Sequence, residues 1–111
     1  MEDTFFVSIG IQQTAQIIDD AVLRGSISGE LIDAYGAAAP GGGGYMLRVY
    51  EKHFFRAGNR LTLTVVLDDF SGSTRVHCVG GGGGEGLFRF DWGAADSFSG
   101  TVAKALAPYR L

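Results

Sequence analysis

Apolar and polar residues alternate along most of the chain with the period of two that is typical of half-buried strands. The clearest case is residues 61–68, where Leu61, Leu63, Val65 and Leu67 are expected to face the core and the residues between them to face solvent. The same alternation predicts further strands at residues 4–11, 26–35, 45–56 and 74–79.

Two stretches follow the helical period instead. The first begins at Gln12, and its apolar stripe consists of Ile17, Ile18, Ala21 and Val22. Gly25 suits the C-terminal cap of this helix. The second helix is expected to begin after Asp91, a good N-cap, and to end at Pro108; its apolar positions are Phe98, Val102, Ala105, Leu106 and Tyr109.

This order of elements predicts an α+β domain that spans residues 1–111. Consecutive strands joined by short turns favour an antiparallel sheet of five to six strands, the sixth being a short strand at residues 87–90. Both helices must bury an apolar stripe, so they are expected to pack on one face of the sheet. The glycines at 41–44 predict a loose connection between the second and third strands.

Residues 80–84 are five consecutive glycines, and such a run is not expected inside a strand or helix. We therefore expect a loop that binds a small ligand or a partner, through Gly82, Gly84, Gly86, Arg89 and Trp92. Backbone N–H groups there could bind an anion, or the glycines could lie flat beside the sheet. A dinucleotide-binding motif requires a helix directly after its glycines, whereas here an aromatic segment follows the glycine run. This difference argues against nucleotide binding.

The strand at residues 45–56 suggests two alternative sites. One face carries Arg48, Tyr50, Lys52, Phe54 and Arg56, a basic and aromatic set that could bind nucleic acid but is more simply a solvated face. The opposite face carries Glu51 and His53, which would point toward the helices if the alternation holds and could then act as an acid–base pair. A bulge near Glu51 would instead turn both outward and place Tyr50 or Phe54 inside. The sequence leaves both orientations open, and the position near a strand end favours partial exposure of Glu51 and His53.

The composition and net charge argue against several classes of function. A net charge of −3 argues against a nucleic-acid or membrane-surface protein. One cysteine, Cys78, excludes an internal disulfide and is expected in the core; with two histidines it offers no metal-ligand set, and no cofactor is expected. The acidic N-terminus does not resemble a signal peptide, and no apolar run is long enough to span a membrane, so a cytoplasmic protein is expected.

Three segments carry a resemblance to known proteins: YEKHFFRAGNRLTLTVVL, STRVHCVGGGGGEG and FRFDWGAADSF. The chain resembles, from about residue 7 to residue 106, a family of small uncharacterised bacterial proteins with a tyrosine-glutamate-lysine strand, a glycine-rich segment and a tryptophan-glycine-alanine helix start. That family implies no reaction. The order of elements also resembles a shortened helix-grip fold, whose larger members hold apolar ligands between sheet and helix.

Together these observations favour a non-enzymatic module that binds a small ligand or protein partner at the glycine-rich loop. A homodimer is compatible with the free edges expected of such a sheet. The alternatives are an enzyme acting through Glu51 and His53, and nucleic-acid binding through the face that runs from Arg48 to Arg56.

Overall fold

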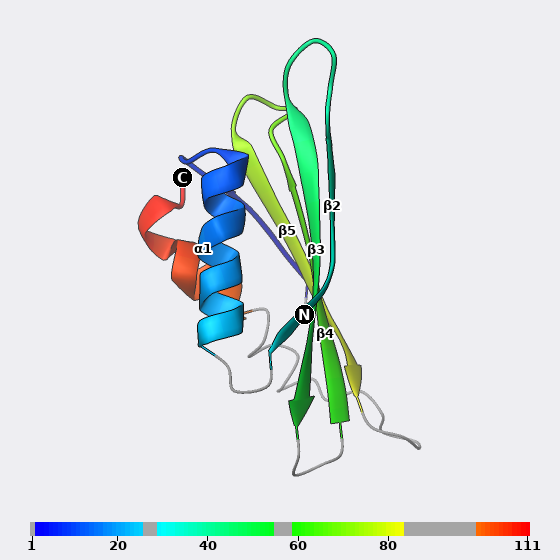
Figure 1. The fold of residues 1–111 in the computed structure, drawn as a ribbon. Helices are drawn as coiled ribbons and strands as arrows, with labels where there is room; N and C mark the ends of the chain where they lie inside the picture. The colour runs from blue at the N-terminus through cyan, green and yellow to red at the C-terminus, as the bar shows by residue number, and fades with distance from the viewer. Residues whose placement is uncertain (1, 26–28, 55–58, 84–99) are drawn as a thin grey trace.

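The computed structural model describes residues 2–25, 29–54, 59–83 and 100–111 (Figure 1). The described strands are β1 (Glu2–Val7), β2 (Glu30–Ala38), β3 (Gly44–Phe54), β4 (Asn59–Asp68) and β5 (Thr74–Gly83). The helix α1 (Ile11–Arg24) follows β1, a C-terminal helix includes residues 100–106, and a 3₁₀ turn, η1 (Ala107–Tyr109), ends the chain.

The strands form one antiparallel sheet in the order β1-β5-β4-β3-β2. Strands β2 to β5 are a meander, and β1 returns to pair with β5 at the far edge. Both helices lie on the same face of this sheet (Figure 1). The predicted α+β class and the shared helix face are confirmed, whereas the proposed sixth strand at residues 87–90 lies outside the described residues.

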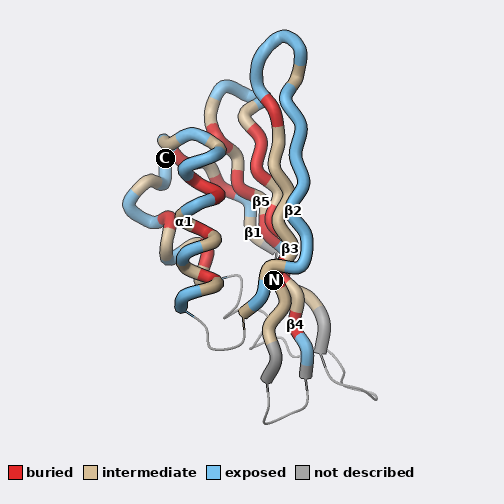
Figure 2. The backbone as a smooth tube through the Cα atoms, in the orientation of Figure 1, coloured by how far each residue is buried: buried red, intermediate tan, exposed pale blue. Residues whose placement is uncertain are grey.

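The core fills the space between the helices and the sheet (Figure 2). As predicted, Leu61, Leu63, Val65 and Leu67 of β4 are fully buried. Val76 and Cys78 of β5 extend the layer, and α1 and the C-terminal helix cover it with Ile18, Val22, Val102 and Leu106. Removing each of these side chains from water stabilises the fold by about 1.5–3 kcal/mol before entropy is counted.

The structure decides the orientation of β3, which the sequence left open. Tyr50 is fully buried beneath the helices, because β3 pairs with β4 in the register that sets Tyr50 opposite Leu63 and Arg48 opposite Val65. Leu47 and Val49 consequently lie on the face without helices. Both faces of β3 carry large side chains, so alternation defines two faces but does not tell which one the helices cover. The irregularity in pairing lies in β2, between Leu31 and Asp33.

The glycine run is also different from the expectation. Strand β5 continues to Gly83, and Gly80 to Gly83 pair with Leu63 to Arg60 of β4. The ladder of hydrogen bonds to a regular neighbouring strand needs no side chains, so β4 can hold the bare backbone of β5 in place. Gly80 is buried opposite Leu63, where the sheet passes beneath the core.

The strand ends shift by several residues from their predicted positions. The first strand ends at Val7 instead of residue 11, and β2 covers Glu30–Ala38 instead of residues 26–35. The connection to β3 is tighter than predicted: Gly42 N donates to Ala39 O at 3.1 Å, with Pro40 at the second position of this turn. Gly42 and Gly43 then adopt φ angles of 101° and 81°, which favour glycine.

Candidate functional site

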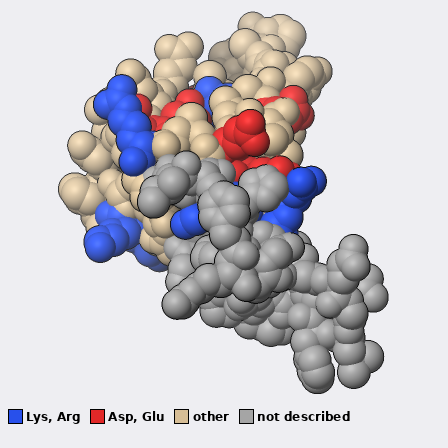
Figure 3. Space-filling view, turned by 60° about the horizontal axis from the view of Figure 1, so that its bottom comes forward, with Lys and Arg blue, Asp and Glu red and all other residues tan. Residues whose placement is uncertain are grey.

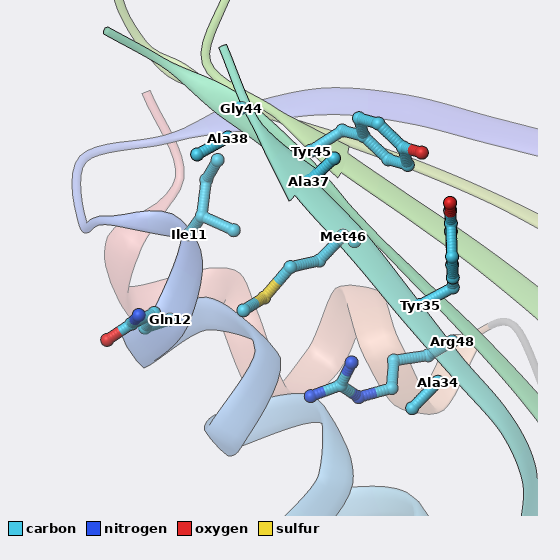
Figure 4. A pocket seen from close by; sticks show the side chains of 11 residues that line it. Ile11, Gln12, Ala34, Tyr35, Ala37, Ala38, Gly44, Tyr45, Met46 and Arg48 are labelled. Atoms are coloured by element: carbon cyan, nitrogen blue, oxygen red, sulfur yellow. The ribbon is translucent and has the colours of Figure 1, made fainter. Parts of the chain in front are cut away.

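A groove of about 510 Å³ lies between the beginning of α1 and the hairpin formed by β2 and β3 (Figure 4). Ile11 and Gln12 form its helix side, and Met46 and Arg48 form its floor. Residues 34–38 of β2 form the remaining side, at the edge of the sheet. In Figure 4 the side chains of Met46 and Arg48 point from β3 toward α1, whereas the rings of Tyr35 and Tyr45 lie on the other side of the strands.

Small residues on β2 create this space. Ala34, Gly36 and Ala38 recur with a period of two, and Ala34 and Gly36 pair with Arg48 and Met46 on the helix-facing side. A Cβ atom added at Gly36 would lie 2.7 Å from the carbonyl oxygen of Tyr45 and 3.3 Å from Cγ of Met46. Close packing of the backbone therefore requires glycine here, and the lack of larger side chains leaves the groove open.

A polar cluster closes one end of the groove floor. The phenol of Tyr50 donates a hydrogen bond to Oδ1 of Asp19 on α1, and Nε of Arg48 donates to the same oxygen at 3.3 Å. Two side chains of β3 thus converge on one carboxylate of α1 at the boundary of the core. The cluster fixes α1 against β3 and leaves the outer part of the Arg48 guanidinium beside the groove.

The environment of Tyr50 decides what this cluster can do chemically. Burial, followed by the hydrogen bond to Asp19, raises the pKa of Tyr50 far above its ordinary value. The phenol therefore stays protonated, and it acts as a hydrogen-bond donor and not as a base. The hydrogen bonds among Tyr50, Arg48 and Asp19 suit binding and positioning.

The opposite face of the hairpin carries an aromatic pair. The ring centroids of Tyr35 and Tyr45 are 6.1 Å apart, and Tyr35 is 60% exposed. Partial burial and the neighbouring Tyr35 raise the pKa of Tyr45. Tyr35 lies on the edge strand β2 and Tyr45 on β3, on the face that the helices do not cover.

Most of the predicted binding loop lies outside the described residues. Gly82 lies within β5 and pairs with Leu61. Gly84, Gly86, Arg89 and Trp92 lie outside the described residues. The loop therefore stays a prediction, and Gly82 belongs to the sheet.

The alternative site consists of Glu51 and His53 on β3. Glu51 lies on the face without helices, where its Oε1 is 3.5 Å from Nε of Arg60. The backbone of His53 pairs with Arg60, while its side chain is outside the described part of the chain. The sequence left the orientation of Glu51 open, and the register that buries Tyr50 turns this next residue outward.

The groove itself was missed by the sequence interpretation. Its signal was present in the Ala-Tyr-Gly-Ala-Ala segment of β2, where small residues recur on one face of a strand. Ala34 and Tyr35 were predicted in the strand, but alanines 37–39 were interpreted as part of the connection to the third strand, and alanine and glycine have low strand propensity. The pairing with β3 overrides that propensity.

The described residues show no metal-ligand cluster and a mixed distribution of charge. No group of three or more His, Cys, Asp or Glu side chains there could hold a metal ion. On the face shown in Figure 3, acidic and basic side chains of the described residues lie among one another, and neither sign forms a continuous patch. Among the helices that the structure describes, none is long and apolar enough to cross a membrane.

Comparison with known proteins gives a family but no activity. Residues 3–110 match a family of unknown function, DUF6054. No curated protein and no solved structure matches the chain at a significant level.

Proposed function

The chain belongs to the DUF6054 family, whose function is unknown, and we propose from the geometry of the groove that it is a non-enzymatic module that binds a small, mainly apolar ligand. The observation that carries this proposal is the groove between α1 and the β2–β3 hairpin. Its volume of about 510 Å³ falls within the roughly 300–1,000 Å³ typical of ligand pockets.

The lining indicates the chemistry of the ligand. Ile11, Met46 and the alanines of β2 offer apolar contacts along most of the groove. Arg48 offers hydrogen-bond donors at one end, and its partial pairing with Asp19 limits the attraction for a free anion. The lining therefore suits an elongated apolar body with one hydrogen-bond acceptor that reaches Arg48.

The fold-level resemblance gives additional support. Helix-grip proteins hold apolar ligands between a sheet and a helix, and this groove lies between a sheet and a helix. This support is an analogy, because a shared fold does not by itself establish a shared function.

The test uses anilinonaphthalene sulfonate, a probe with an apolar body and one anionic sulfonate group whose oxygens accept hydrogen bonds. Ala34→Phe should fill the groove and weaken binding of the probe at least about tenfold, while amide shifts in the unsubstituted protein should centre on Ile11 and Met46. Val79→Phe is the control, since Val79 is exposed, pairs with Thr64 on the face without helices and lies outside the groove lining. Equal binding by both variants, or amide shifts centred away from the groove, would contradict the proposal.

The other two functions have less support from the described residues. The hydrogen bonds of Arg48 and Tyr50 to Asp19 take two members of the suggested nucleic-acid face into the helix interface. Glu51 pairs with Arg60, which favours a structural role for this carboxylate. Both functions stay predictions.

A further inference from the structure

The two edges of the sheet differ in whether described residues cover them. The outer edge of β1 is covered at its C-terminal end by the last residues of the chain: Ser8 N donates to Tyr109 O at 2.8 Å, and Leu111 N donates to Phe6 O at 3.0 Å. Val7 and Arg110 form a bridge between these two bonds. At the other end of the sheet, no described strand pairs with the outer edge of β2.

The exposed edge of β2 has few features that would prevent pairing. Every residue from Ile32 to Ala38 is exposed, and the strand contains no Lys, Arg or Pro. Soluble proteins usually protect an edge strand with such residues, with a bulge or with a covering segment. The pairing irregularity near Leu31 protects the beginning of β2, but the segment from Asp33 to Ala38 runs in regular register with β3.

The direction of the backbone groups identifies which residues would pair. Ala39 N donates to Gly43 O at 2.8 Å, so Ala39 faces β3. Backbone groups alternate between the two sides of an antiparallel strand. Tyr35 and Ala37 therefore bond to β3, and Ala34, Gly36 and Ala38 present their N–H and C=O groups at the open edge.

We propose that β2 pairs antiparallel with β2 of a second copy of this chain, about a twofold axis at Gly36, to form a continuous ten-stranded sheet. This proposal goes beyond the ligand groove and does not depend on it. Gly36 is the midpoint of the three residues that face the edge, so Ala34 of one copy pairs with Ala38 of the other. An isologous contact of this kind closes at two subunits.

The side chains of β2 are compatible with this register. Asp33 falls opposite Ala39 of the second copy, so the strand's carboxylates do not face one another across the axis. Tyr35 falls opposite Ala37, whose own cross-strand neighbour is Tyr45. The exposed ring of Tyr35, 60% accessible in the single chain, would thus gain an aromatic neighbour from the second copy.

Pairing would also change the groove. Ala34 and Ala38 lie on the helix-facing side of β2, so the corresponding residues of the second copy would continue the same surface. The two grooves would then join beneath the two α1 helices, and each copy would form part of the other's open side. The dimer therefore extends the apolar wall that the single chain provides.

The experiment is sedimentation velocity of the purified chain from micromolar to millimolar concentration, combined with amide hydrogen exchange followed by NMR. We expect a monomer–dimer equilibrium in which the amides of Ala34, Gly36 and Ala38 become protected as the dimer forms. The amide of Ala37 should be protected in both states, because it bonds to β3.

Ala34→Pro should raise the dimer dissociation constant at least about thirtyfold, because the symmetric dimer loses two hydrogen bonds. Proline is tolerated where an edge N–H faces solvent, so the single chain should keep its circular dichroism spectrum. Ala38→Pro provides a second variant if the first does not fold, and Ala37→Ser is the matched control that should dimerise normally. A monomer at all concentrations, a dimer with unprotected edge amides, or a dimer that tolerates both proline variants would overturn the proposal.

Discussion

At the scale of single residues, Asp19 links the fold to the candidate site. Its carboxylate accepts from Tyr50 and Arg48, which stand on the strand that forms the groove floor. Asp19 lies on the helix that forms the opposite side. The position of α1, and with it the width of the groove, therefore depends on hydrogen bonds made at one carboxylate.

Tyr50→Phe tests this linkage. Loss of the phenol's bond to a charged acceptor should lower the free energy of unfolding by about 2 kcal/mol. Tyr35→Phe is the matched control, because Tyr35 is largely exposed, and it should change stability by less than about 0.5 kcal/mol. Urea unfolding followed by circular dichroism measures both, and equal midpoints for the two variants would contradict the role assigned to Tyr50.

For Tyr50→Phe we also expect a different dependence of stability on pH in the alkaline range. The pKa of Tyr50 is raised in the folded state, so the folded chain keeps this proton while the unfolded chain loses it above about pH 10. The stability contributed by the protonated phenol is thus complete below the unfolded pKa and decreases as the pH rises above it. Unfolding midpoints measured across this range should fall less steeply for Tyr50→Phe, with the residual slope including Tyr45, whose pKa is also raised.

At the scale of elements, the two hairpin loops at one end of the sheet are joined by Asp69. Gly44 N donates to Oδ1 of Asp69 at 2.9 Å, which ties the loop before β3 to the loop between β4 and β5. Gly43 has a φ of 81°, and a Cβ atom there would lie 2.8 Å from the same oxygen. The β2–β3 hairpin therefore depends on Gly43 for its backbone angle and for the space in which Asp69 bonds to Gly44.

Gly43→Ala should consequently destabilise the chain by about 1–2 kcal/mol, from the left-handed backbone alone, with the displaced Asp69 adding to this effect. Gly41→Ala in the same loop is the control, since its Cβ would meet no atom within 4 Å and its φ is not positive. Thermal unfolding distinguishes the two. A Gly43→Ala chain as stable as Gly41→Ala would show that the loop adapts without strain.

Sequence patterns predicted which segments form strands and helices better than they predicted which face of each strand is buried. The alternation of β4 identified its buried residues, because only one of its faces is strongly apolar. In β3, apolar and polar residues occur on both faces, so the side covered by α1 could not be decided before the register with β4 was known. Gly80 to Gly83 show the same limit, since a neighbouring strand, and not their own propensity, makes them a strand.

The candidate site was less predictable for a related reason. A groove depends on what is missing between elements, and Ala34, Gly36 and Ala38 become informative only when α1 is placed opposite them. The open edge of β2 likewise depends on strand order. Period-two patterns indicate which segments are strands, but the position of β2 at the edge follows from the pairing of β1 with β5.

At the scale of the whole molecule, both helices and all five described strands contribute to one buried layer. Cys78 lies within that layer, between Val65 of β4 and Asp3 of β1 in the register of the sheet. A reagent can therefore reach its sulfur only when the packing of helices on sheet is broken. A domain of this size with one core is expected to unfold in a single cooperative transition.

Labelling of Cys78 by a thiol-specific disulfide reagent should therefore coincide with global unfolding. Burial raises the pKa of the thiol to about 11, so the folded chain combines an inaccessible sulfur with a low thiolate fraction at mildly alkaline pH. Because the chain has one cysteine, the labelled fraction reports this site alone, and its denaturant midpoint should equal that of the circular dichroism signal. Leu63→Ala, a core change expected to remove about 2–5 kcal/mol, should move both midpoints together. Labelling that precedes the loss of secondary structure would show that the helices separate from the sheet while its strands remain paired. That result would contradict unfolding of the core in a single cooperative transition.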